Sequence, residues 1–545
     1  MAAADIPAAK RAGLPVDLDR LAAEGDEWLT PEDRYALKTH GVCAQLQPGA
    51  FMIRVRIPGG VLLADQARGL ARIARTNAAD WLHLTTRQGL ELHHVEARKV
   101  RDVLALVARL GLTTRSACGH TLRNVVVSED AGLGLDEPFD CMPDARLVSD
   151  AVVARSAELN CTLPSRVNLV FGGSPRSRDD ALLNDGAFVS VVRGGCAGYE
   201  IWAGGSLGRA PRLAVRIAEF VPRDDVLAAA EALIDVFVAH GDLDHPARGR
   251  MKYVVESLGE DGFRRAFAMA FDAARSRPHP VAPPVEVIDP DAAAAILGDV
   301  PPGGWSAGVR PQRRSGRVLL TVDVPMGDLE SVELEALADL SDRYADGAIT
   351  LSRDQNVVFR DVAVGAVARI RDDLLGSGLS VLGESPVAAV RACTGSAVCD
   401  LGIASAPDAG AALLASPALA RNSTLRVHVS GCPNSCAQHQ AGDIGLAGTK
   451  VRIGGAVRDG YQVFLGADVG ARRVGAVAGR VAAEDVPAVV DAAVGAWEAV
   501  RHGSETLGQT VHRLGLDAFA AHIEAVLDDR WAAGADPDAS LLTLP

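Results

Sequence analysis

The stretch Leu84-Thr-Thr-Arg-Gln-Gly-Leu-Glu-Leu-His-His-Val95 has a counterpart later in the chain, Leu351-Ser-Arg-Asp-Gln-Asn-Val-Val-Phe-Arg-Asp-Val362. The two stretches lie 267 positions apart, and the same offset relates Gly111-Leu112 to Gly378-Leu379. A constant offset across separated blocks indicates an internal duplication, which constrains the architecture before any single motif is considered. We therefore expect a pseudo-twofold body built from two similar halves.

The residues around each copy of this stretch predict the same order of strands and helices. Residues 51–57 alternate apolar side chains with arginines, which is the period of a half-buried strand, and residues 318–324 alternate in a similar way. An amphipathic helix is expected near residues 66–76, followed by a strand at 81–84. The pattern predicts a βαββα-like unit in each copy.

Each copy continues into a larger segment with mixed strand and helix patterns. Helical patterns near residues 224–239 and 485–501 close the two larger segments, and a Pro-rich stretch at 277–284 marks the junction between the halves. We therefore expect an α/β (α+β) fold with two half-domains and two larger α/β domains. The predicted parts are an N-terminal arm (1–40), a first half-domain (41–124), a first larger domain (125–285), a second half-domain (286–385) and a second larger domain (386–545).

Composition excludes several classes of protein. The 545 residues are 48% apolar, but no stretch approaches the roughly 18 uninterrupted apolar residues that a membrane helix needs. The first twenty residues lack the apolar core of a secretory signal, so we expect a soluble, cytoplasmic protein. The net charge of −14 argues against a nucleic-acid binder, and nine cysteines in so long a chain do not indicate a disulfide scaffold.

Four of these cysteines fall in two close pairs in the last third of the chain. Cys393 and Cys399 are separated by five residues, and Cys432 and Cys436 stand in Gly-Cys-Pro-Asn-Ser-Cys. Soft sulfur ligands select zinc, copper(I) or an iron–sulfur cluster, and the wide first spacing fits a structural zinc site poorly. Buried free cysteines are the alternative, but flanking Gly, Pro, Asn and Ser are typical of loops. The pattern therefore favours a [4Fe–4S] cluster.

The spacing C-x5-C followed by G-C-P-N-S-C resembles the cluster signature of the sirohaem-containing nitrite and sulfite reductases, and residues 442–448 also resemble that family. The resemblance implies ferredoxin-like half-domains and larger domains that bind sirohaem and the cluster. It implies that Cys436 is also the axial ligand of the sirohaem iron, with Asn434 of the same motif at the cofactor. The implied cluster ligands are Cys393, Cys399, Cys432 and Cys436.

Basic segments of the first half resemble the anion-binding motifs of the same family. Thr85-Thr-Arg87-Gln88 resembles its T-T-R-Q motif, and Leu122-Arg123-Asn124-Val125 resembles its R-N-V motif. Leu163-Pro-Ser-Arg166-Val-Asn168 resembles its L-P-R-K-x-(K/N) segment, and Arg250-Met-Lys252-Tyr253 a segment that faces the cofactor carboxylates. The resemblance implies an anion site formed by Arg87, Arg123, Arg166 and Asn168, and cofactor contacts from Gln88, Arg250 and Lys252.

Two departures from the family pattern bear on the substrate. Ser165 and Arg166 stand where the family usually has Arg and Lys, and because arginine stays protonated, anion binding is kept while proton donation from this position is disfavoured. Asn168 carries one positive charge fewer than the lysine of many sulfite reductases, which favours a singly charged anion. The Cys-Thr-Gly sequence that begins at Cys393 also favours nitrite over sulfite.

The resemblance implies an oxidoreductase that reduces nitrite to ammonia, or sulfite to sulfide, by six electrons at a sirohaem coupled to a [4Fe–4S] cluster. No G-x-G-x-x-G fingerprint for a nicotinamide cofactor is present, so we expect an external donor such as an acidic, ferredoxin-like protein. Two alternatives remain open. One is an oxygen-dependent hydroxylase of cobalamin synthesis similar to precorrin-3B synthase, and the other is a non-catalytic iron–sulfur protein that carries electrons or senses redox state.

Overall fold

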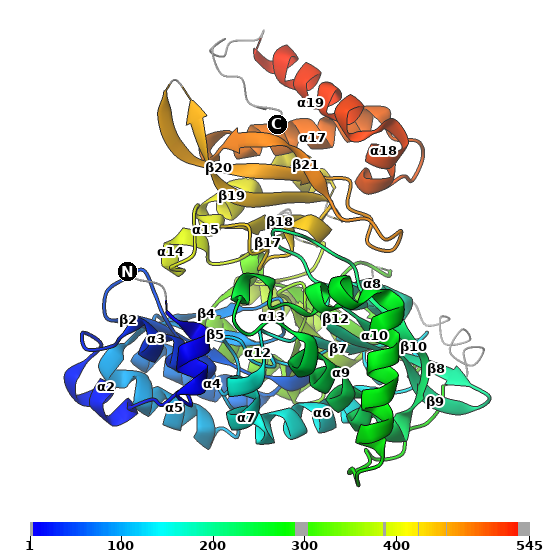
Figure 1. The fold of residues 1–545 in the computed structure, drawn as a ribbon. Coiled ribbons are helices and arrows are strands. Elements are labelled where there is room, and N and C mark those ends of the chain that lie inside the picture. Colours follow the sequence, from blue (N-terminus) through cyan, green and yellow to red (C-terminus); the bar gives the residue numbers. More distant parts are fainter. Residues whose placement is uncertain (1–3, 289–303, 385–388, 423, 454, 532–545) are drawn as a thin grey trace. The chain divides into compact units, whose positions relative to one another are not determined.

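The computed structural model describes residues 4–288, 304–384, 389–422, 424–453 and 455–531 (Figure 1). Contacts between residues divide the chain into two compact units. Unit 1 comprises Met1–Ser206, Arg212–Val322 and Asp328–Leu379, and unit 2 comprises Leu207–Pro211, Asp323–Gly327 and Ser380–Pro545. Each unit is described by itself.

Unit 1 contains both copies of the predicted repeat, and each element of the second copy begins 267 residues after its counterpart. The predicted strands and helix of the first copy are present, with the helix extended by one or two residues at each end. The first copy consists of β1 (Val42–Ala44), β2 (Ala50–Val55), β3 (Val61–Leu63), α4 (Ala64–Asn77), β4 (Trp81–Leu84), β5 (Leu90–Glu96) and α5 (Val100–Arg109). The second consists of β11 (Val309–Pro311), β12 (Arg317–Asp323), β13 (Asp328–Glu330), α12 (Ser331–Tyr344), β14 (Ala348–Leu351), β15 (Val357–Ala363) and α13 (Val367–Gly376).

The two copies exchange a strand. The first sheet has the order β1-β2-β5-β4-β13, so it ends on a strand of the second copy, and the other sheet, β11-β12-β15-β14-β3, ends on a strand of the first. Leu329 of β13 lies opposite Leu82, and Leu62 of β3 lies opposite Ile349. Each sheet is therefore completed by the other copy.

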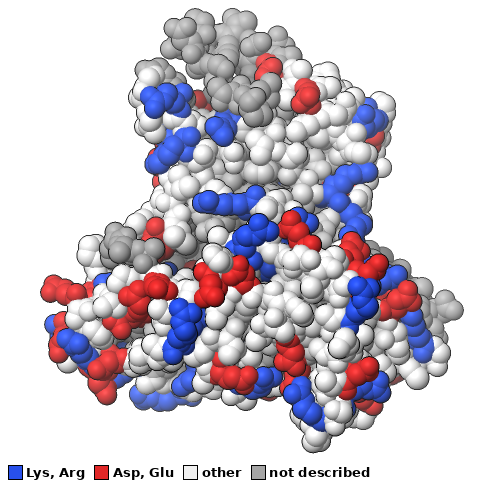
Figure 2. All heavy atoms as spheres, viewed as in Figure 1, with Lys and Arg blue, Asp and Glu red and all other residues white. Residues whose placement is uncertain are grey.

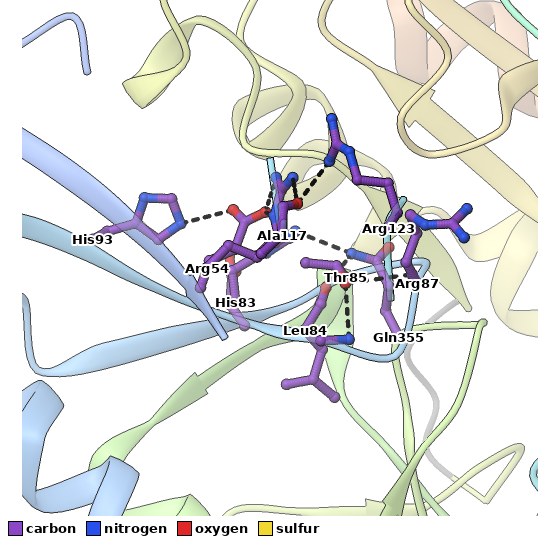
Figure 3. Close-up of polar contacts among 12 residues, drawn as sticks. Arg54, His83, Leu84, Thr85, Arg87, His93, Ala117, Arg123 and Gln355 are labelled. Carbon is purple, nitrogen blue, oxygen red and sulfur yellow. Dashed lines mark hydrogen bonds and ion pairs between the residues drawn. The ribbon is translucent and has the colours of Figure 1, made fainter. Parts of the chain in front are cut away.

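A matching pair of glutamines joins the copies at the turn after β4 and β14. The side-chain Nε2 of Gln88 donates to the carbonyl oxygen of Leu351 at 2.9 Å. The Nε2 of Gln355 donates to the carbonyl oxygen of Leu84 at 2.7 Å (Figure 3). Both glutamines adopt positive φ, 55° and 63°, in the turns that lead into β5 and β15. The repeat thus extends to unusual backbone conformations.

A third sheet of unit 1, with the order β10-β9-β8-β7-β6, carries the larger first-half segment. Helix α9 packs over its core through Ala229, Leu233 and Phe237, which are buried. The strands are β6 (Val126–Val127), β7 (Leu169–Gly172), β8 (Gly186–Arg193), β9 (Cys196–Ala203) and β10 (Val215–Pro222), and the helices are α6 (Met142–Ala154), α7 (Ser156–Thr162), α8 (Pro175–Ala181), α9 (Val226–His240) and α10 (Met251–Arg275).

Unit 2 is built around a sheet with the same plan. Its order is β17-β18-β19-β20-β21, with two parallel pairings followed by two antiparallel ones, as in the sheet β6–β10. The predicted helix at 485–501 is α17. The strands are β17 (Val390–Ala392), β18 (Val427–Ser430), β19 (Ile444–Ile453), β20 (Ala456–Leu465) and β21 (Ala476–Ala482), and the helices are α14 (Gly395–Val398), α15 (Ala406–Leu414), α16 (Pro417–Arg421), α17 (Val486–Val500), α18 (Leu507–Leu514) and α19 (Leu516–Trp531).

The segment predicted to be an N-terminal arm forms three helices, α1 (Ile6–Arg11), α2 (Leu18–Glu24) and α3 (Pro31–Thr39). Side-chain oxygens of Asp5, Asp17 and Thr30 cap them by accepting a backbone N–H of the first turn, which stabilises short helices. Polar residues thus form capped helix starts here. Among the helices of the described ranges, none has the length and apolar composition that a membrane crossing needs.

Candidate functional site

The two cysteine pairs lie at the carboxyl ends of neighbouring parallel strands of unit 2. Cys393 follows β17 directly, and Cys432 follows β18 after one glycine. The backbone N–H of Cys393 donates to the carbonyl oxygen of Val429 at 3.1 Å, and the N–H of Gly431 donates to the Cys393 Sγ at 3.2 Å. Parallel pairing therefore places the two cysteine loops side by side.

Glycines allow these loops to approach each other closely. A Cβ added at Gly431 would lie 2.5 Å from the Cα of Gly395, and one added at Gly448 would lie 2.2 Å from the carbonyl oxygen of Gly431. The same holds at Gly402, where a Cβ would lie 2.4 Å from the backbone nitrogen of Ser396. Backbone contacts this close leave no room for a side chain, so the glycines are required by the packing of the loops.

The four thiols lie within electrostatic reach of one another. Burial raises the pKa of Cys393, and Cys436 and Cys432 raise it further. Burial also raises the pKa of Cys399 to about 11, with further contributions from Cys436 and Cys432. Metal ligation requires thiolates, so a positively charged group bound here would offset this penalty.

The spacing of the thiols distinguishes between kinds of metal centre. Within the part of the chain that the structure describes, no three Cys, His, Asp or Glu side chains lie close enough to hold a single metal ion. A polynuclear cluster attaches its four cysteines to different irons and needs a wider cage. Four cysteines on two neighbouring loops are the ligand set that a [4Fe–4S] cluster uses. Cys436 and Asn434 are exposed, whereas Cys432 is buried.

Polar side chains fix the segment that follows Cys436. Arg391 donates to the side-chain Oε1 of Gln438 at 2.6 Å, and His428 Nδ1 lies 3.0 Å from the Gln438 carbonyl oxygen. Burial and the charge of Arg391 lower the pKa of His428, so this histidine is neutral near pH 7. Gln440 also exchanges two hydrogen bonds, of 3.0 and 2.7 Å, with the backbone of Gly208.

Unit 1 brings together the basic residues predicted to bind the anion and the cofactor. Burial lowers the pKa of Arg87, and Arg123 and Arg353 lower it further. Because an arginine stays protonated, the lowered pKa indicates that holding the positive charge of Arg87 at this buried position costs free energy. Arg250 adds to this cost, whereas the carboxylate of Asp185 offsets part of it. The result is a cationic cluster formed by Arg87, Arg123, Arg166, Arg250 and Lys252.

Arg123 is fixed by the backbone of the loop that precedes it. Its guanidinium donates to the carbonyl oxygen of Ala117 at 2.7 Å and twice to that of Gly119, at 2.9 and 3.2 Å. Arg54 also donates to the Ala117 carbonyl, at 3.5 Å, and to Glu91, at 2.8 Å. Figure 3 shows Ala117 between the two arginines. Arg123 is thereby positioned before any ligand is present.

Arg87 and Gln88 differ in how much of their hydrogen-bonding capacity the chain uses. Arg87 Nη2 donates to the Asn124 carbonyl oxygen at 3.2 Å, but its buried Nε has no hydrogen-bond partner among the described residues. The Gln88 amide, by contrast, bonds to both the N–H and the carbonyl oxygen of Val127 and to Leu351. Arg87 retains a donor for a ligand, and Gln88 holds the strands together. The cofactor contact of Gln88 stays a prediction.

A buried ion pair organises Arg250 and Asn168. Both side-chain oxygens of Asp185 accept from Arg250, at 2.8 to 3.2 Å, and the Asp185 side chain is 0% exposed. Asp185 also accepts the backbone N–H of Asn168 at 3.0 Å. The Asn168 Oδ1 is buried and has no partner in the described part of the chain, which leaves it for a ligand or a water.

Sequence reasoning missed Asp185, and the second half contains the signal that would have found it. Asp443 lies 258 positions later, accepts the backbone N–H of Arg426 at 2.9 Å and bonds its side chain. The β18–β19 connection therefore repeats the β7–β8 connection. Arg353, a neighbour of Arg87 that forms an ion pair with Asp180 at 2.7 Å, was also missed.

The cationic cluster contains charges of one sign, whereas the surface carries both signs. Figure 2 shows basic and acidic side chains interspersed over the face that it displays. Within the cluster, burial and then Arg250 lower the pKa of Lys252 to about 8. A buried group of like charges needs an anion, and a polycarboxylate cofactor with a small anionic substrate fits that need.

Comparisons with known proteins match both parts of the fold. A family model described as "Nitrite and sulphite reductase 4Fe-4S domain" matches residues 118–273 and 384–530, and one described as "Nitrite/Sulfite reductase ferredoxin-like half domain" matches 44–110 and 310–376. The structure of the NirA protein of Mycobacterium tuberculosis superposes with a TM-score of 0.79 at 25% identity, covering 94% of this chain and 96% of that one. The predicted duplicated α/β fold is thereby confirmed.

Curated relatives are similar over most of the chain. The ferredoxin–nitrite reductase of Synechococcus elongatus is 30% identical over 469 residues, which are 83% of this chain and 87% of the relative. The assimilatory ferredoxin-dependent nitrite reductase of Haloferax mediterranei is 28% identical over an alignment 561 positions long, which covers 94% of this chain and 91% of the relative. The similarity thus spans both units.

Proposed function

The chain belongs to the nitrite and sulphite reductase family and is an oxidoreductase with that family's 4Fe–4S domain, and from this premise we propose that it reduces nitrite to ammonia with electrons from a ferredoxin. We propose that Cys393, Cys399, Cys432 and Cys436 hold the [4Fe–4S] cluster and that Cys436 also ligates the iron of a sirohaem. When bound, these two groups would supply the six-electron reduction, and the protein supplies orientation and charge.

The observation that supports this proposal most is the cationic cluster of unit 1. Sirohaem carries eight carboxylates, and a group of neighbouring positive charges matches such a ligand better than it matches an apolar one. Arg250 and Lys252 are assigned to the cofactor carboxylates. The cofactor contacts of Gln88 and Asn434 stay predictions, because the Gln88 amide already bonds to Val127 and Leu351. Arg87, with its unused Nε, and Arg123, held by backbone carbonyls, are assigned to the substrate anion.

The residues of the anion site favour nitrite over sulfite. Arg166 gives a permanent positive charge, and Asn168 offers an amide whose Oδ1 is unused in the described chain. A site with a neutral amide at this position suits a singly charged anion better than a doubly charged one. The names of the similar ferredoxin–nitrite reductases agree with this choice.

A paired steady-state assay tests the proposal. Protein purified without oxygen is given reduced methyl viologen and either nitrite or sulfite, and ammonia and sulfide are quantified. We expect a higher kcat/KM with nitrite. A higher kcat/KM with sulfite would reverse the substrate assignment while keeping the class of enzyme. The absorption spectrum and iron content of the same sample report whether sirohaem and cluster are present.

The same sample separates the proposal from the two alternatives. A protein with an intact cluster but without sirohaem, which forms neither product, would fit a precorrin-3B synthase-like hydroxylase or a non-catalytic iron–sulfur protein. Oxygen-dependent turnover of a tetrapyrrole would then distinguish the hydroxylase from the electron carrier. Sirohaem in the spectrum together with ammonia as product would exclude both.

A further inference from the structure

Two cysteines that the cluster does not use lie against each other in unit 1. Cys43 belongs to β1, and Cys118 lies in the loop between α5 and β6. That loop runs along the end of α3, because the Ser116 N–H donates to the Thr39 carbonyl oxygen at 2.7 Å. Arg54 connects the two segments, because its backbone N–H donates to the Gly41 carbonyl oxygen at 2.9 Å and its side chain to the Ala117 carbonyl oxygen at 3.5 Å. Cys43 and Cys118 therefore lie on neighbouring segments, and each thiol shifts the pKa of the other.

The surroundings of the pair favour a thiolate on Cys118. The neighbouring Cys43 thiol and the positive charges of Arg54 and Arg123 lower the pKa of Cys118, whereas the Cys118 thiol and burial raise the pKa of Cys43. The thiolate is the nucleophilic form of cysteine, and low-pKa cysteines beside a second thiol are the ones that oxidise reversibly. Cys43 is partly exposed and Cys118 is buried, so the pair lies just below the surface.

The pair adjoins the loop that positions Arg123. Cys118 stands between Ala117 and Gly119, and the carbonyl oxygens of these two residues are the ones that accept the Arg123 guanidinium. Figure 3 shows the Ala117 carbonyl as the shared acceptor of Arg54 and Arg123. A covalent bond at Cys118 would therefore tie this loop to β1.

We propose that Cys43 and Cys118 are a reversible dithiol–disulfide pair that is oxidised by hydroperoxides. The Cys118 thiolate attacks the terminal peroxide oxygen, the O–O bond breaks, and a sulfenic acid and hydroxide form. The Cys43 thiol then displaces the hydroxyl group from Cys118 as water and forms the S–S bond. Two electrons pass from the two sulfurs to the peroxide, and with hydrogen peroxide two waters leave in total.

Peptide mapping of the holoenzyme tests this directly. Trypsin, which cleaves after Lys and Arg, places Cys43 on peptide 39–54 and Cys118 on peptide 116–123. Protein treated with a few equivalents of hydrogen peroxide, alkylated with N-ethylmaleimide and digested should give the two peptides joined. Dithiothreitol should separate them. Recovery of both peptides singly, whether alkylated or oxidised to sulfinic acid, would overturn the proposal.

Two variants show whether the crosslink depends on the pair of Cys43 and Cys118. In Cys43→Ser, we expect the sulfenic acid on Cys118 to persist and to be trapped by dimedone, because the resolving thiol is absent. Cys161→Ser, which changes a partly exposed cysteine on peptide 156–166, should leave the crosslink unchanged. Disulfides that arise from cluster loss would join peptides 392–421 and 427–450 and are distinguished by mass. Equal dimedone labelling of Cys118 in wild type and Cys43→Ser would also contradict the proposal.

Discussion

At the scale of single residues, the candidate site relies on groups that are positioned by the backbone. Arg123 makes three hydrogen bonds to carbonyl oxygens, so its charge is in place before an anion arrives and need not reorganise. Arg250 is held by a side chain instead, the buried carboxylate of Asp185. Three predictions follow from the fixed charges.

Replacing Arg123 should weaken anion binding. Charge-assisted hydrogen bonds contribute about 1.5–3 kcal/mol each, so Arg123→Ala should raise KM for nitrite by roughly 10- to 100-fold. Arg123→Lys should retain part of the affinity, because charge remains while the fork of donors is lost. Arg109→Ala, at an exposed arginine of α5, is the matched control. A KM for Arg123→Ala equal to that of the control would remove Arg123 from the anion site.

Lys252 should give anion affinity a dependence on pH. Its pKa is lowered to about 8 by burial and by Arg250, so it is charged below that pH and neutral above it. Lys252 is assigned to the cofactor, but its charge also acts on Arg166 of the anion site, so we expect KM for nitrite to rise as pH passes from 7 to 9. In Lys252→Arg the charge persists across this range, so the rise should disappear. Parallel pH profiles of the two proteins would contradict an involvement of Lys252.

Asp185 should matter more for stability than an exposed aspartate. Removing one partner of a buried ion pair leaves an uncompensated charge and costs about 3–5 kcal/mol, so Asp185→Ala should lower Tm strongly. Asp244→Ala is the control, because Asp244 is 70% exposed and its pair with Arg11 lies at the surface. Thermal melts of both variants provide the measurement, and equal Tm values would refute the assignment.

At the scale of elements, the cysteine loops depend on parallel strands and on glycines between them. Gly431→Ala places a Cβ within 2.5 Å of the Gly395 Cα, so the loops must separate and the cluster cage must widen. We expect iron and sulfide content per chain to fall well below the wild-type value. Gly376→Ala is the control, since a Cβ there meets nothing within 4 Å. Wild-type iron content in Gly431→Ala would show that the loop tolerates the shift.

The sequence predicts where single strands and loops lie better than it predicts which strands pair and which side chains meet. Alternation predicts β2 and β12 to within two residues, and the glycine-flanked cysteine pairs predict the loops after β17 and β18. No pattern in the sequence shows which strands of the two copies pair with each other. The exchange of β3 and β13 therefore could not be predicted. Asp185 was missed for a related reason, because a side chain that accepts a backbone N–H seventeen residues away leaves no local periodic signal, and only its repetition 258 positions later at Asp443 indicates it.

At the scale of the whole molecule, unit 1 is one cooperative body and not two independent half-domains. Each ferredoxin-like sheet takes its edge strand from the other copy, and Gln88 and Gln355 reach across in both directions. An isolated copy would leave the edge of β4 or β14 unpaired, which is an aggregation hazard. The stability of one copy therefore depends on side chains of the other.

Core substitutions in the exchanged strands should destabilise unit 1 to a similar degree. Leu62 and Leu329 are equivalent positions in β3 and β13 and are 0% and 1% exposed. Leu62→Ala and Leu329→Ala should each cost about 2–5 kcal/mol, visible as similar drops in Tm. Leu63→Ala, one residue along the same strand but 55% exposed, should change Tm little. A large effect of only one of the two buried variants would contradict the mutual dependence.

The exchanged strands also constrain how the chain can change over evolutionary time. Two identical ancestral chains that swapped these strands would already have formed a homodimer, and fusion of their genes would have preserved that interface within one polypeptide. Since then, a shift of register in β4 would have required a matching change in β13, which is encoded almost 250 codons away. The two copies can diverge in the turns after β4 and β14, as Arg87 and Asp354 have, but the exchanged strands must be inherited as a pair.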